Sequence, residues 1–202
     1  MYILCMILLG MVIIGLISEN QRLKKNEKHL KKKAQTDSLT KIYNRASVEY
    51  LIDDFLHSQD GKNGVHGLLL VDLDNFKDIN DTYGHNAGDQ VLVQLSNLLK
   101  QKFRKTDIVG RMGGDEFLVF IKSMEDEEQI QAYGTMIINE IEMLKNIRDI
   151  KVTASMGICT NCGKNFHQMY LEADKALYQA KEKGKNVCFL YKNEKEGNTI
   201  NT

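Results

Sequence analysis

The chain has 202 residues, of which 43% are hydrophobic and 27% charged. This length suffices for one packed domain with a short appendage, and the composition argues against wholesale disorder. Basic and acidic residues balance at 27 each, but residues 1–36 hold seven Lys/Arg and two Glu, which leaves 20 basic and 25 acidic groups downstream. This net-acidic main part is not built to bind nucleic acid by counterion release, and four cysteines do not make a disulfide framework in a chain of this length.

The first 17 residues carry no charge and are mostly Ile, Leu, Met and Val. As a helix they span about 25 Å, the short end of what crosses a bilayer. The positive charges that follow predict that the C-terminal side lies in the cytoplasm. We expect residues 1–18 to form a single transmembrane anchor. A cleaved signal peptide fits poorly, because no positive charge precedes the run and no small-x-small site follows it. The other alternative is that this start is the end of a longer receptor.

Residues 19–36 are expected to be a basic helical stalk, since they contain no Gly or Pro. Leu16, Leu23 and Leu30 recur every seven positions, as in a self-pairing helix. Polar residues interrupt the companion stripe, so a solvated basic stalk near anionic lipid is the alternative. The sequence leaves both open.

Residues 37–192 form the predicted main domain, and the polar residues 193–202 a disordered tail. The predicted elements are a helix over 45–58, a strand over 66–74, a helix over 87–103, strands over 107–112 and 115–121, a helix over 123–146, a strand over 151–159, a helix over 166–183 and a strand over 186–191. After the first helix, the order is that of a split β-α-β (ferredoxin-like) core, which predicts an α/β (α+β) fold with a mixed central sheet.

The first polar cluster follows the strand over 66–74. Asp72 and Asp74, two residues apart, are predicted on one face. Carboxylates at a strand end suit Mg²⁺ and, through it, phosphates. Lys77 can meet an anionic phosphate, while Asn80 and Asp89 can read a base edge. The alternative is a polar loop with helix caps.

The second cluster is a predicted hairpin tip. Gly113 and Gly114 expose the backbone there, so that a nucleotide can lie against it, and Asp115 and Glu116 add anionic oxygen. Such turns are common and weak evidence alone. If the strands are adjacent, however, Asp115 approaches Asp72, and carboxylates from two strand ends are what two-metal phosphoryl transfer needs.

The third cluster places Lys181 and Lys185 one helical turn apart at a helix C-terminus. They can bind phosphate, or merely complement the helix dipole.

These motifs resemble those of the GGDEF-type diguanylate cyclases, over residues 37 to about 191. The matching segments are DSLTKIYNR (37–45), DLDNFKDINDTYGHNAGD (72–89), GGDEF (113–117) and ADKALYQAKEKGKN (173–186). The resemblance implies a nucleotidyl-cyclase-like fold and a homodimer that condenses two GTP into cyclic di-GMP and two pyrophosphates. It also implies Mg²⁺, with Mn²⁺ as an alternative, and, with the anchor, the inner (cytoplasmic) membrane of a bacterium, the catalytic domain lying in the cytoplasm.

The resemblance also implies roles for individual residues. Asp72, the Leu73 carbonyl and Asp115 would hold the metal, and Asp115 would help to deprotonate the attacking 3′-hydroxyl. The other residues implied are Glu116 and Lys77 in catalysis, Asn80 and Asp89 on guanine, and His85, Gly113, Gly114, Lys181 and Lys185 on the rest of the nucleotide.

Arg104 and Asp107 have the R-x-x-D spacing of the family's inhibitory product site, although such a pair is often only surface charge. Lys185 stands where relatives often carry Arg, which replaces a bidentate grip with a point charge. Cys159 and Cys162 form a C-x-x-C pair without a second ligand pair nearby, so a redox or metal role is not expected.

Two other functions fit the motifs less well. A receptor that binds cyclic di-GMP or GTP without turnover normally shows erosion of the 113–117 motif, which is intact here. A mononucleotide cyclase shares this kind of sheet but is disfavoured by the whole motif set.

Overall fold

The computed structural model describes residues 19, 35–144, 150–161 and 163–192. The chain divides into two units, Met1–Thr36 and Asp37–Thr202. The predicted anchor over 1–18, nearly all of the predicted stalk and the predicted tail over 193–202 lie outside the described residues. Within the described ranges, no helix combines the length and the apolar character needed to cross a bilayer.

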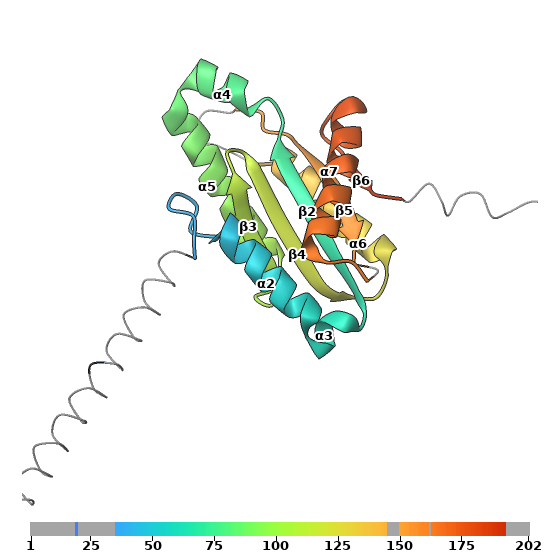
Figure 1. Cartoon of the computed structure of the whole chain (residues 1–202). Coiled ribbons are helices and arrows are strands. Elements are labelled where there is room, and N and C mark those ends of the chain that lie inside the picture. The colour runs from blue at the N-terminus through green and yellow to red at the C-terminus, as the bar shows by residue number, and fades with distance from the viewer. Residues whose placement is uncertain (1–18, 20–34, 145–149, 162, 193–202) are drawn as a thin grey trace, which may run out of the picture. The chain divides into compact units, whose positions relative to one another are not determined.

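A six-stranded mixed sheet forms the centre of the second unit (Figure 1). Its strands are β1 (Tyr43–Asn44), β2 (Val65–Leu73), β3 (Ile108–Gly113), β4 (Glu116–Met124), β5 (Ala154–Thr160) and β6 (Cys188–Leu190), in the spatial order β1-β3-β4-β2-β5-β6. β2 is antiparallel to both β4 and β5, whereas the outer strands β1 and β6 run parallel to their neighbours. The placement of β2 between β4 and β5 confirms the predicted split β-α-β core.

Helices cover both faces of this sheet. They are α2 (Arg45–His57), α3 (Gln59–Lys62), α4 (Phe76–Tyr83), α5 (His85–Lys102), α6 (Glu127–Glu142) and α7 (Phe166–Glu182). Along β2, Leu69 and Val71 pack with residues of α5 and α6, while Leu68 and Leu70 pack with residues of α2 and α7. Both faces of β2 are therefore buried, which explains why this strand reads as a continuous apolar run instead of an alternating pattern.

Two elements differ from the prediction. The helix predicted from Ser123 begins at Glu127, because β4 continues to Met124 and Asp126 caps the helix by accepting a hydrogen bond from the Gln129 amide at 2.7 Å. The polar segment after β2 contains a helix, α4, that the sequence analysis did not assign. Only Ile79 of α4 is buried, so the segment lacks the apolar stripe that marks a helix in sequence.

His66 is a fully buried polar residue in β2. Its ring Nδ1 accepts a hydrogen bond from the Ser123 amide of β4 at 2.9 Å, and the ring packs edge-on against Phe55 of α2. Burial lowers the pKa of this imidazole, and the charge of Lys122 lowers it further, while nearby backbone groups offset part of the shift. The fold therefore requires a neutral His66.

We predict that His66 makes the domain less stable in mild acid. Because its folded-state pKa lies below the unfolded value of about 6.5, the unfolded chain binds the proton more tightly. The contribution of neutral His66 to the free energy of unfolding should be fully present above that value. It should fall progressively as the pH drops toward the lowered folded-state pKa. His66→Asn, whose side-chain oxygen can accept the Ser123 bond, should flatten the dependence of unfolding free energy on pH between about 7 and 5.

Chemical denaturation at several pH values measures this slope. His167→Asn is the control, because His167 is exposed. An equal slope in the wild type and the His66 variant would contradict the prediction.

Candidate active site

The acidic residues of two strands meet where β2 ends and β4 begins. Asp72 lies directly opposite Glu116 in the antiparallel register. The Leu73 amide donates to the Asp115 carbonyl at 3.4 Å, so the turn before β4 lies against the end of β2. The structure thus brings Asp72, Leu73, Asp115 and Glu116 to one edge of the sheet.

The electrostatics of this edge are those of crowded carboxylates. Burial raises the pKa of Asp72, and the neighbouring Asp115 and Asp74 raise it further, whereas Lys181 lowers it. Burial likewise raises the pKa of Glu116, and the charge of Asp72 adds to the effect. The Lys181 ammonium of α7 lies 2.9 Å from Asp72 Oδ1 and offsets part of the repulsion. The Lys181 ammonium is thus a positive charge that the protein itself places beside the Asp72 carboxylate.

The donor set suits a hard divalent cation. In the parts of the chain that the structure describes, no three His, Cys, Asp or Glu side chains are arranged to hold a metal by themselves. Two carboxylates, Asp72 and Asp115, with a Leu73 backbone oxygen would supply only part of a shell of six oxygens. Phosphate oxygens of a nucleotide are the natural complement, since Mg²⁺ in phosphoryl-transfer sites is commonly held by one or two carboxylates plus substrate phosphates.

The carboxylate of Asp74 makes structural hydrogen bonds. β2 ends at Leu73, and the buried Asp74 carboxylate accepts from Ser155 Oγ at 2.7 Å and from the Asn186 amide at 3.0 Å. It therefore joins β5 to the loop after α7.

The residues expected on guanine lie on α4 and α5. A Cβ at Gly88 would fall 2.0 Å from Asn80 Oδ1, so the lack of a side chain at Gly88 leaves room for the Asn80 amide in its present position. The His85 and Asp89 side chains are exposed on the first turns of α5, and Lys77 is exposed on the first turn of α4. In the described structure, no hydrogen bond or ion pair joins these four side chains to the acidic cluster.

Lys185 reaches a different partner from Lys181. Its ammonium donates to Asn75 Oδ1 at 2.6 Å, immediately before α4. Asn75, Lys185 and Asn186 all have positive φ values. The bond between Lys185 and Asn75 joins the two loops. The two lysines thus contact the two ends of the segment from Asp72 to Asn75.

The proposed product site has one side chain exposed and the other buried. Arg104 is exposed just after α5. The Asp107 carboxylate is buried and accepts from the Arg104 amide at 2.9 Å and from the Lys122 amide at 3.2 Å. Asp107 therefore closes the turn between α5 and β3 and ties it to β4.

Cys159 is buried in β5, and Cys162 lies outside the described residues. Burial raises the pKa of the Cys159 thiol, and its hydrogen bond to Glu172 at 3.1 Å raises it further. A thiol of this kind is a poor nucleophile and a poor metal ligand.

Three residues to which the sequence analysis gave no role contact this region: Asn75, Asn186 and Arg111. Arg111 donates to the Gly114 carbonyl in the turn that carries Asp115. Asn75 and Asn186 lie inside motifs already quoted, and Arg111 lies in the strand predicted over 107–112. Nothing else in the sequence marked these residues, because their partners are distant in the chain or belong to the backbone.

Comparison with known proteins identifies the family of this chain. Residues 34–187 match the family model described as "Diguanylate cyclase, GGDEF domain". The chain is 36% identical over 177 residues to the uncharacterized protein YtrP of Bacillus subtilis. This match covers 85% of this chain and 28% of that protein. It is 33% identical over 160 residues to the diguanylate cyclase DgcS of Shewanella oneidensis, with coverage of 77% and 52%. The chain thus spans roughly a quarter to a half of the length of these curated relatives.

Solved structures show the same fold. The coiled coil and GGDEF domain of DgcB from Caulobacter crescentus, in complex with c-di-GMP, superposes with a TM-score of 0.78 at 25% identity, covering 90% of this chain and 98% of that one. The active GGEEF domain of a diguanylate cyclase from Vibrio cholerae gives a TM-score of 0.69 at 25% identity, with coverage of 75% and 98%. Family model, relatives and fold agree, and the chain belongs to the GGDEF family of diguanylate cyclases.

Proposed function

We propose that this protein condenses two GTP molecules into cyclic di-GMP and two pyrophosphates, with Mg²⁺ or Mn²⁺ bound, across a homodimer. The observation that carries the proposal is the convergence of Asp72, Asp115 and Glu116 at one sheet edge, with Lys181 on the first of them. Relatives named diguanylate cyclases support the same reaction.

The side chains divide the chemistry among them. The 3′-hydroxyl oxygen of one GTP forms a bond to the α-phosphorus of the other. The bond between that α-phosphorus and the oxygen that bridges to the β-phosphate breaks, and pyrophosphate leaves. Asp115 takes the hydroxyl proton, and Lys77, Lys181 and Lys185 stabilise the phosphate charge. Asn80 and Asp89 bind guanine, and His85 lies beside the nucleotide. The backbone of Gly113 and Gly114 contacts the nucleotide. A divalent cation held by Asp72, the Leu73 carbonyl and Asp115, with Glu116 alongside, would neutralise negative charge on the phosphates.

Because cyclic di-GMP is made from two GTP molecules, one domain with one bound GTP cannot complete the proposed reaction. Each half-reaction needs a nucleophile from one bound GTP and an electrophile from another, so two domains must present their sites to each other. We further propose that residues 1–18 anchor the chain in the inner membrane of a bacterium, with the GGDEF domain in the cytoplasm, and that Arg104 and Asp107 bind the product as an inhibitor.

We predict that Asp115→Asn removes the cyclase activity. The amide cannot accept the 3′-hydroxyl proton and is a weaker cation ligand, so turnover should fall by at least about a hundredfold. Chromatographic product analysis with GTP and Mg²⁺ measures this and separates cyclic di-GMP from a mononucleotide product. Asp81→Asn, an exposed acid of α4, is the matched control. Retention of full activity in Asp115→Asn would refute its role.

We predict opposite effects of Lys181→Met on two ligands. Removing the ammonium 2.9 Å from Asp72 should raise the KM for GTP, because one phosphate contact is lost. The same change should tighten Mn²⁺ binding to the nucleotide-free protein at about pH 8, because a repelling charge is removed. Mn²⁺ titration followed by electron paramagnetic resonance measures the second effect, with the exposed Lys175→Met on the same helix as the control. Weaker Mn²⁺ binding would contradict this picture.

We predict that Arg104→Ala relieves product inhibition by about tenfold without changing thermal stability, because its side chain is exposed. Asp107→Ala should instead destabilise the fold by about 1–3 kcal/mol, since two backbone amides lose their acceptor. Inhibition curves and thermal denaturation separate the two effects, with exposed Lys62→Ala as the control. If inhibition is the same in Arg104→Ala as in the wild type, the proposed product site is wrong.

A further inference from the structure

The turn that carries Asp115 contains two adjacent glycines, the residue type with the greatest backbone freedom. Gly113 and Gly114 have φ values of +149° and +53°, and no atom lies within 4 Å of the position that a Cβ would occupy on either. Side-chain packing therefore does not fix this turn, and two adjacent glycines carry a large conformational entropy. Something else must hold Asp115 in place.

Arg111 of β3 supplies a constraint from side-chain atoms, in addition to the backbone pairing of Gly113 with Glu116 and the Leu73 amide bond to Asp115. Its guanidinium grips the Gly114 carbonyl with two hydrogen bonds, from Nε at 2.9 Å and from Nη2 at 2.6 Å. The Gly114 carbonyl and the Asp115 amide belong to one planar peptide group. Two donors on that oxygen therefore fix the plane from which the Asp115 side chain departs.

The Nη1 group of Arg111 is held by Asp37. Arg111 Nη1 lies 3.1 Å from Asp37 Oδ1, and the two side chains are only 14% and 23% exposed. The same oxygen accepts from the Thr40 amide at 2.8 Å and from the Thr40 hydroxyl at 2.7 Å. Burial alone would raise the pKa of Asp37, but the Thr40 hydrogen bonds and Arg111 outweigh it, and the pKa is lowered.

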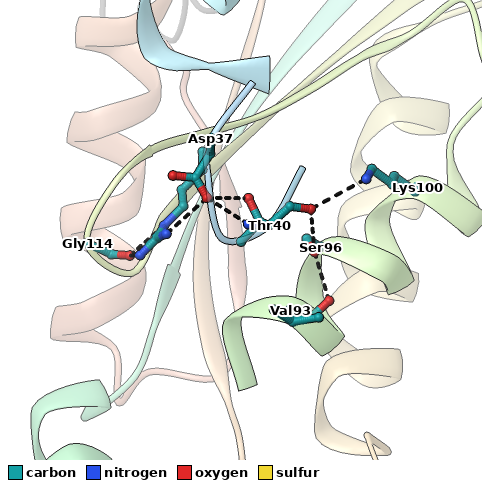
Figure 2. Close-up of polar contacts among 7 residues, drawn as sticks. Asp37, Thr40, Val93, Ser96, Lys100 and Gly114 are labelled. Atoms are coloured by element: carbon teal, nitrogen blue, oxygen red, sulfur yellow. Dashed lines mark hydrogen bonds and ion pairs between the residues drawn. The ribbon is translucent and has the colours of Figure 1, made fainter. Parts of the chain in front are cut away.

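The anchor itself is fixed to the scaffold. The Lys100 ammonium of α5 donates to the Thr40 carbonyl at 3.4 Å (Figure 2) and to the Lys41 carbonyl at 3.0 Å. Ser96 Oγ of α5 lies 3.4 Å from the same Thr40 carbonyl and donates its proton to the Val93 carbonyl at 2.7 Å. The Asp37 amide also donates to the Ile42 carbonyl at 2.8 Å. A continuous chain of contacts thus runs from α5 through the 37–42 turn to Arg111 and on to Gly114.

We propose that Arg111, anchored by Asp37, is a positioning residue that holds the Gly113–Gly114 turn so that Asp115 faces Asp72. This inference rests on the proposed function for its catalytic consequence, but the positioning itself concerns the fold alone. A lysine could keep the ion pair with Asp37, but it could not present two fixed parallel donors to one carbonyl. The geometry therefore requires arginine at this position.

The structure also provides a reporter of the turn that does not depend on activity. The Leu73 amide donates to the Asp115 carbonyl, so its hydrogen exchange reports whether the turn stays against β2. The variants are Arg111→Lys, which loses the two-donor grip, and the milder Asp37→Asn, which keeps an acceptor for Thr40 but loses the charge. Lys102→Met, which breaks the ion pair between α5 and α6 at Glu140, is the matched control.

We expect Arg111→Lys to speed Leu73 amide exchange about tenfold and to lower kcat for cyclic di-GMP by about tenfold, while KM for GTP changes less than about threefold. Asp37→Asn should show smaller changes in the same direction, and Lys102→Met none. In the double variant the effects should not add, since both residues act through one clamp. Thermal denaturation confirms that each variant is folded.

The outcomes separate the two proposals. Unchanged Leu73 exchange in folded Arg111→Lys and Asp37→Asn would overturn the positioning role, whatever the activity. A wild type that makes no cyclic di-GMP, combined with faster Leu73 exchange in the variants, would overturn the proposed function and leave the positioning role standing. A fall in kcat that is equal in Lys102→Met would show a general effect of stability and would also overturn the positioning role.

Discussion

The antiparallel pairing of β2 with β4 is the constraint on which the site depends. It sets Asp72 opposite Glu116 and brings the backbone of Asp115 against Leu73, so that like charges face each other at one sheet edge. Directly opposed like charges on neighbouring strands destabilise a sheet. The buried strand bodies, with Leu70 paired with Leu118 and Val71 with Phe117, supply the apolar burial that keeps the register despite this repulsion. The fold thus stores unfavourable electrostatics where a cation and a phosphate can relieve them.

Polar groups around this edge have distinct tasks that look alike in the sequence. Asp72 forms an ion pair with Lys181, whereas the neighbouring Asp74 accepts hydrogen bonds from Ser155 and Asn186. Lys181 meets the acids and Lys185 meets Asn75. Because these groups have defined partners, the ends of β2 and α7 and the start of α4 are held together by the protein's own contacts, which is the kind of preorganisation that electrostatic catalysis requires.

The glycine turn shows how flexibility and order are combined. Two glycines leave the hairpin tip free of side chains, so a nucleotide can approach its backbone, but they also leave Asp115 poorly held. Arg111 and Asp37 restore the order through hydrogen bonds to the backbone instead of through side-chain bulk. The site therefore keeps an open surface and a fixed carboxylate at the same time.

The sequence by itself determined the family, the split β-α-β core and the set of polar clusters, because motif spacing, apolar runs and a double glycine are local patterns. Helix α4 escaped it, since one buried residue, Ile79, gives no periodic signal. Only the tertiary structure decided which acids are free and which are bound: Asp74 joins a loop 112 positions away, Asp107 is closed by the backbone of Lys122, and Arg111 finds Asp37 across 74 positions. Such pairings depend on sheet order and register, which bring distant residues together and which no local pattern encodes.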